Sequence, residues 1–265
     1  MKTLLAIEWL KIKRYRTFWI LIGFFLVLLP LWNYQIENGM IKMSGGGANG
    51  INFLSQAYSF PEVWGNVSFW ASIFVLFLSI LIIILTTNEY SFRTHRQNVI
   101  DGWSRLQFFH AKVAIVLIVS FLTTLYVFIV GLLMGIVNSG DINQAFTQFY
   151  KLGYFFLLSV NYLGFALLIS LLIRRSGLSI GLFLLYSLII ENILRGLLNW
   201  GNDLNLGDFL PLQASDELLP LPLFQLFSSM AAPQTVPDTY YIIASIGWCA
   251  LYYFIGRRML LRSDW

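Results

Sequence analysis

Long apolar runs separated by short polar segments dominate this chain of 265 residues. A helix needs about 20 predominantly apolar residues to cross the hydrocarbon core of a bilayer. Six runs meet or approach this length and are predicted to be membrane-spanning helices: Phe18–Trp32, Val67–Thr87, Val113–Val137, Leu152–Ile173, Leu178–Leu198 and Tyr240–Ile255. The predicted fold class is therefore an all-α integral membrane protein, with one transmembrane domain over residues 1–265.

Composition supports this class of protein. Hydrophobic residues make up 58% of the chain and charged residues only 11%, whereas a soluble domain has about 25% charged residues. The single cysteine, Cys249, excludes an intrachain disulfide and any site with several Cys ligands. His95 and His110 lack further ligands at suitable spacing, so no metal site is predicted.

Basic residues gather on one side of the six predicted spans. When the N-terminus is placed in the cytoplasm, every Lys and Arg except Lys42, Lys151 and Arg195 falls in a cytoplasmic segment or at its edge. The positive-inside rule therefore predicts that both termini are cytoplasmic. The same rule explains the sequence pI of about 9.2 without a nucleic-acid partner.

Two segments outside the spans carry apolar residues. In residues 1–16, apolar side chains fall roughly on one side of a helix, which predicts an interfacial helix on the membrane; the alternative is a basic tail that only sets orientation. The outer loop 199–239 contains no Lys or Arg. Its stretch Leu218–Ala232 is apolar but short and interrupted by Pro, so it is predicted to be re-entrant or interfacial, or else an apolar loop over the helix ends.

Motifs of catalysis are absent from the sequence. It contains no G-x-x-x-x-G-K-[ST] phosphate-binding loop, no H-E-x-x-H and no G-x-S-x-G. We therefore expect that the chain is not an enzyme by itself and holds no cofactor.

The segment 88–112, between the second and third predicted spans, is the most polar part of the chain. It predicts a helix leaving the membrane, a short cytoplasmic helix, a break near Gly102, and a helix capped by Ser104 that enters the third span. Arg105 and Lys112 would then face lipid headgroups or a partner. Val99, Ile100 and Trp103 place apolar bulk among the charges, which favours the bilayer surface or a docking groove over a merely solvated loop.

This segment resembles the cytoplasmic loop of ABC-2 type transporter permeases. The residues that match the family pattern are Glu89, Thr94, Arg96, Ser104, Arg105, Ala111 and Lys112. Arg93 stands where the family often has Gly, and Gly102 where it usually has Pro. The order of a basic N-terminal helix, six spans and a long apolar outer loop before the sixth also resembles this family.

The resemblance implies the permease subunit of an ABC exporter in a bacterial inner membrane. Two permeases, identical or related, would pair with two separate ATPase subunits that bind Mg-ATP. The segment 88–112, with the N-terminal helix, would contact the ATPase. The residues implied in this coupling are Glu89, Arg93, Thr94, Arg96, Gln97, Asp101, Gly102, Ser104, Arg105 and Lys112.

Three of the polar residues inside predicted spans are candidate functional residues: Asn161, Glu191 and Arg195. Glu191 and Arg195 are spaced i,i+4, so a mutual ion pair would offset part of the roughly 2.5–3.5 kcal/mol that each charge costs there. They would line a substrate path, hold a permease dimer together, or form an internal pair near the outer interface. Asn161 is predicted to form a hydrogen bond between helices.

Two questions remain open from the sequence. Gly131 and Gly135, like Gly177 and Gly181, have a spacing that permits close helix approach, within the chain or in a dimer. The alternative function is a membrane protein outside the ABC class, such as a secondary carrier or an assembly factor. A carrier would favour more ionisable residues near mid-membrane than this chain has.

Overall fold

The computed structural model describes residues 2–13, 15–38, 58–92, 94, 102–139, 144–200, 205–220 and 236–262. These residues form helices and turns, and no strand occurs among them. The longer helices are α1 (Lys2–Lys13), α2 (Arg16–Glu37), α4 (Val63–Ser91), α6 (Arg105–Asn138), α7 (Tyr150–Ile173), α8 (Ser176–Leu185), α9 (Glu191–Asn199) and α12 (Asp238–Arg262). The short elements are the π-helix η1 (Tyr186–Ile190), the 3-10 helix η2 (Leu206–Phe209) and α10 (Gln213–Asp216).

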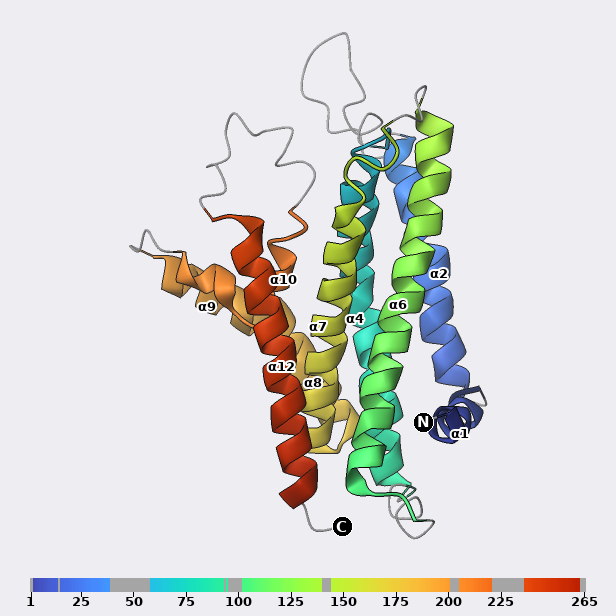
Figure 1. Cartoon of the computed structure of the whole chain (residues 1–265), viewed down its shortest axis with the longest axis vertical. Helices are drawn as coiled ribbons and strands as arrows, with labels where there is room; N and C mark the ends of the chain where they lie inside the picture. Colours follow the sequence, from blue (N-terminus) through green and yellow to red (C-terminus); the bar gives the residue numbers. More distant parts are fainter. Residues whose placement is uncertain are drawn as a thin grey trace.

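Six helical stretches in the described part of the chain are long and apolar enough to cross a membrane. They are α2, α4, α6, α7, the continuous run α8–η1–α9 and α12, which confirms the six predicted spans. Figure 1 shows α2, α4, α6, α7 and α12 side by side in a bundle, with α9 turned away from it and with α1 and the last turns of α12 toward the same end. We call this the α1 end of the bundle.

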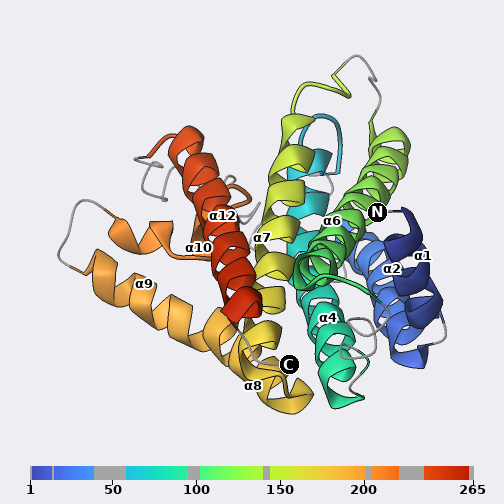
Figure 2. The ribbon, with the colours of Figure 1, turned by 60° about the horizontal axis from the view of Figure 1, so that its bottom comes forward.

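The helices α4 and α7 form the centre of the bundle. They pack against each other, α2 packs on α4, and α12 packs on α7. Their buried side chains include Leu78, Phe155 and Leu163. Figure 2 shows the consequence, with α1 and α2 on one flank and α8, α9 and α12 on the other.

The third span begins earlier than its apolar run suggests, at Arg105 rather than Val113. The cause is a capping box: Ser104 Oγ accepts a hydrogen bond from Gln107 N at 3.2 Å, and Gln107 Oε1 accepts one from Ser104 N at 2.8 Å. Gly102 just before it has φ +94°, which a side chain rarely tolerates. The predicted break at Gly102 and the predicted cap at Ser104 are confirmed.

The glycine pair of α6 is used within the chain. A Cβ atom on Gly131 would lie 3.0 Å from the ring of Trp64, and one on Gly135 would collide with the ring of Phe60. The pair therefore makes room for two aromatic rings near the start of α4. By contrast, no atom lies within 4 Å of the corresponding positions on Gly177 and Gly181.

Candidate functional site: two clusters of polar side chains

At the α1 end, four charged side chains from α1, α4 and α6 form a compact cluster, which we call the ion cluster. Lys112 Nζ lies 2.6 Å from Glu8 Oε2 and 2.8 Å from Glu89 Oε1. Lys11 Nζ lies 3.0 Å from Glu8 Oε1 and 3.1 Å from Glu89 Oε1. Two positive and two negative charges therefore neutralise one another where three helices meet.

Burial makes this neutrality necessary. Glu8, Glu89 and Lys112 are all buried, and an uncompensated charge removed from water costs several kcal/mol. Burial raises the pKa of the Glu8 carboxyl, but the ammonium groups of Lys112 and Lys11 outweigh burial and hold the pKa below its ordinary value. Glu8 is therefore ionised, and the cluster ties α1 to the two helices that flank the segment 88–112.

The structure describes six of the ten residues implied in coupling. Thr94 Oγ1 donates a hydrogen bond to the carbonyl of Glu89, Gly102 and Ser104 set the start of α6, and Arg105 Nη1 donates to the carbonyl of Leu261 at the end of α12, at 3.2 Å. Glu89 and Lys112 are in the ion cluster. The other four lie outside the described residues: Arg93, Arg96, Gln97 and Asp101.

One expectation for this segment is wrong. Lys112 was expected to face lipid headgroups or a partner, yet its side chain is only 3% exposed because the carboxylates of Glu8 and Glu89 enclose its ammonium group. Glu8 itself was missed as a site residue. A signal was present, since Glu8 is the only acidic residue before Glu37 and is spaced i,i+3 from Lys11.

A second group of polar side chains lies where residues 205–219 fold back onto α7 and α9, and we call it the loop cluster. Its titratable members are Glu191, Arg195, Asp208, Asp216 and Glu217. Arg195 Nε lies 2.8 Å from Asp208 Oδ1, and its Nη2 pairs with Glu217. These contacts fasten the loop to α9.

The predicted ion pair between Glu191 and Arg195 is wrong. Glu191 Oε1 instead accepts hydrogen bonds from the backbone N–H groups of Leu212, at 2.7 Å, and Gln213, at 3.1 Å. The reason is that the folded loop brings backbone donors to Glu191 and two carboxylates to Arg195, so each charge finds partners outside its own helix. Spacing along one helix could not reveal them.

Asn161 forms its predicted hydrogen bonds, but to the loop. Asn161 Nδ2 donates to the carbonyl of Pro211 at 2.8 Å and to Ser215 Oγ at 3.1 Å. Since Asn161 lies about 16 Å along α7 from Tyr150, this part of the loop reaches the middle of a spanning helix. The stretch predicted to be re-entrant, Leu218–Ala232, begins just after it and lies mostly outside the described residues.

Asp216 gives the loop cluster a dependence on pH. Burial raises the pKa of Asp216 to about 8, the hydrogen bond from Tyr162 opposes this effect, and Glu191 and Glu217 add to it. Because folding raises the pKa of Asp216, protonated Asp216 stabilises the folded loop. This stabilisation is full below about pH 4 and is lost as the pH rises through about 8. We expect the protection of residues 205–219 against hydrogen exchange, measured relative to the intrinsic exchange rate at each pH, to fall over this range, and the variant Asp216→Asn to show a flatter profile. An identical profile in the variant would contradict this assignment.

The loop cluster is rich in carboxylates but does not group them as a metal site would. Among the described residues, no set of three or more His, Cys, Asp or Glu side chains is placed to hold a metal ion. Hydrogen bonds and ion pairs within the chain account for the contacts of Glu191, Arg195 and Asp208. The observed role of this cluster is to hold the loop against α7 and α9.

The six membrane-length helices, with charged side chains collected into clusters, define a multi-pass membrane protein. The sequence model of a family described as "ABC-2 family transporter protein" matches residues 4–190. The chain belongs to this family, and it is a membrane permease of an ABC transporter. No curated protein matches the chain. The matched region contains the whole ion cluster and ends just before Glu191, so it does not include the loop cluster.

Proposed function

We propose that this chain is the membrane subunit of an exporter in a bacterial inner membrane, with both termini in the cytoplasm, and that a separate ATPase subunit drives it. Family membership supports partnership with an ABC ATPase. The observation that carries the proposal is the ion cluster, because it connects the segment 88–112 rigidly to three helices. A second permease copy, or a related permease, would complete the transporter, and Mg-ATP would bind only to the ATPase.

The ion cluster joins the two ends of the segment 88–112 to each other. Glu89 stands near its beginning and Lys112 at its end, and their side chains are 2.8 Å apart. Lys11 and Glu8 attach α1 to the same point. A force on this segment would therefore move α4, α6 and α1 together instead of being absorbed at a flexible joint, as a rigid-body transition requires.

The exposed part of the segment is the proposed contact with the ATPase. Gly102 is exposed in the structure and Arg105 is partly exposed, and Arg105 also donates a hydrogen bond to the carbonyl of Leu261. Arg96 and Asp101 are proposed for the same contact on the family resemblance. Glu89 and Lys112 act through the ion cluster and would position the contact without touching the ATPase.

Charge reversal tests this contact. Because interfacial charge pairs contribute about 1.5–7 kcal/mol, we expect Arg96→Glu or Arg105→Glu to reduce the ATPase recovered per permease about tenfold or more. The measurement is quantitative co-purification after affinity capture of the permease from membranes. Arg175→Glu is a matched control, since Arg175 is exposed at the turn between α7 and α8 on the same side of the membrane. A loss with Arg175→Glu as large as with Arg96→Glu would place the contact elsewhere.

A further inference from the structure

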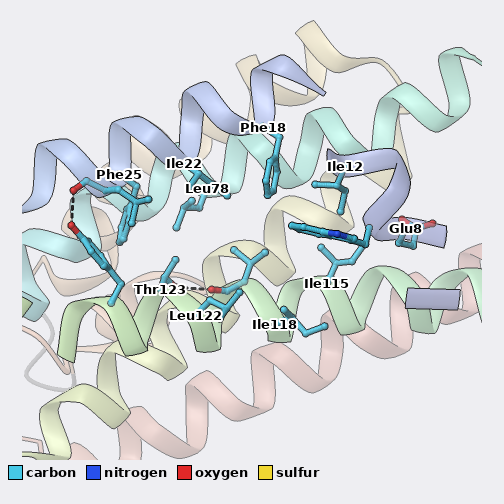
Figure 3. A pocket seen from close by; sticks show the side chains of 14 residues that line it. Glu8, Ile12, Phe18, Ile22, Phe25, Leu78, Ile115, Ile118, Leu122 and Thr123 are labelled. Atoms are coloured by element: carbon cyan, nitrogen blue, oxygen red, sulfur yellow. Dashed lines mark hydrogen bonds between the residues drawn. The ribbon is translucent and has the colours of Figure 1, made fainter. Parts of the chain in front are cut away.

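A pocket of about 470 Å³ lies between α2 and α6, with α1 at one end and α4 as its floor. Its volume falls within the range of small-molecule sites, about 300–1,000 Å³. In Figure 3, side chains of α2 and α6 point toward each other across this space. Six of the facing residues are Phe18, Ile22, Phe25, Ile115, Ile118 and Leu122.

The pocket extends along α6 and has an exposed rim. Its floor is buried, as at Phe25 and Leu78, whereas Ile118 and Leu122 on its rim are 43% and 55% exposed. The lining on α6 runs from Ile115 to Tyr126, a rise of about 16 Å at 1.5 Å per residue. One leaflet contributes about 15 Å to the hydrocarbon core of a bilayer. The pocket thus has the length of one acyl chain and opens where lipid would surround the bundle.

Polar contacts bound the pocket at both ends. Pro30 has no N–H group, so the carbonyl of Leu26, four residues earlier, loses its partner within the helix. The hydroxyl of Tyr126 on α6 donates to this carbonyl and joins the two helices there. At the other end Glu8 lines the pocket while its carboxylate pairs with Lys112 and Lys11.

Positive charge lies at the corner between α1 and α2, where the pocket begins. Lys13 and Arg16 are exposed there, and their neighbours Ile12 and Phe18 line the pocket. The nearest acidic residue in the sequence, Glu8, is already neutralised in the ion cluster. The corner is therefore net positive, which favours an anionic headgroup above an apolar chain.

We propose that this pocket binds one acyl chain of an anionic phospholipid, with the headgroup held by Lys13 and Arg16. A lipid in this place would contact α1, α2 and α6 at once, next to the ion cluster. The proposal rests on the pocket and its charged corner, and it holds whether or not a separate ATPase drives the protein.

The test uses the purified full chain in nanodiscs that contain phosphatidylglycerol with a photoreactive acyl chain. We expect cross-links to concentrate on residues 18–26 of α2 and 115–126 of α6. Leu122→Trp and Ile118→Trp fill the pocket and should each lower this labelling about tenfold, because a close-packed site leaves no room for the chain. Leu125→Trp is the matched control, since Leu125 is similarly exposed on α6 but does not line the pocket.

The headgroup is tested with the double variant Lys13→Gln/Arg16→Gln. Its labelling by the anionic probe should fall to the level given by a phosphatidylcholine probe, while Arg257→Gln/Arg258→Gln, at the exposed end of α12, should keep the wild-type level. Equal labelling of wild type by both probes would overturn the choice of an anionic lipid. Equal labelling of Leu122→Trp and Leu125→Trp, or a cysteine cross-link from position 122 to a second copy of the chain, would overturn the pocket as a lipid site.

Discussion

Replacing Lys112 by methionine should lower the free energy of unfolding by about 3–5 kcal/mol, because it removes the buried ammonium group that pairs with the buried carboxylates of Glu8 and Glu89. Methionine keeps most of the volume of lysine, so the lower free energy of unfolding would result from the missing charge and not from a cavity. The measurement is reversible unfolding of the purified protein in detergent micelles, followed by helical signal.

Two controls separate this effect from a general sensitivity of the bundle. Lys11→Met removes a side chain that is 31% exposed, and exposed ion pairs contribute about 0–1 kcal/mol, so its loss should be small. The double variant Lys112→Met/Glu8→Gln restores electrical balance between Lys11 and Glu89 and should recover part of the stability. A loss below about 1 kcal/mol for Lys112→Met, no larger than an exposed ion pair contributes, would show that the ion cluster does not hold α1, α4 and α6 together.

Replacing Arg195 by methionine should release the loop cluster, since Asp208 and Glu217 would then lose the cation they share. Hydrogen bonds to charged groups contribute about 1.5–3 kcal/mol each. Because the Arg195 side chain is 36% exposed, solvent would compensate part of this, and we expect a loss of about 2 kcal/mol. The measurement is hydrogen exchange of residues 205–219, which should quicken, while exchange near the ion cluster stays unchanged.

Asn192→Ala is the matched control for Arg195→Met. Asn192 lies on α9 near Arg195, but it is exposed and its side chain donates only to carbonyls one turn earlier in its own helix. Hydrogen exchange of residues 205–219 should therefore remain at the wild-type rate in this variant. Unchanged exchange in Arg195→Met would mean that α7, through Asn161 and Tyr162, suffices to hold the loop.

The spans were predictable because their signal is local. Length and apolarity fix where a helix can cross a membrane, and the six runs of the sequence correspond to the six membrane-length helices. The start of α6 was also predictable, since Ser104 and Gln107 are three residues apart and satisfy each other's backbone groups. Such features depend on neighbouring residues and not on the rest of the fold.

The charged clusters were only partly predictable because their contacts join distant segments. Glu8 meets Lys112 across 104 residues, and no spacing rule connects them. Glu191 and Arg195 show the opposite error, because their i,i+4 spacing predicted a mutual ion pair that does not form. In the folded loop, Glu191 instead accepts a hydrogen bond from Leu212 N, and Arg195 pairs with Asp208 and Glu217. A buried charge in the sequence thus indicates that a partner exists, but not which residue it is.

The central claim, that a separate ATPase drives this permease, is tested most directly by affinity capture of the wild-type chain from its native membranes in mild detergent. The proposal predicts that a subunit with a G-x-x-x-x-G-K-[ST] motif is recovered in equal amount with the permease, and that the complex hydrolyses ATP whereas the isolated permease does not. Recovery of the folded permease with no ATP-binding subunit would contradict it.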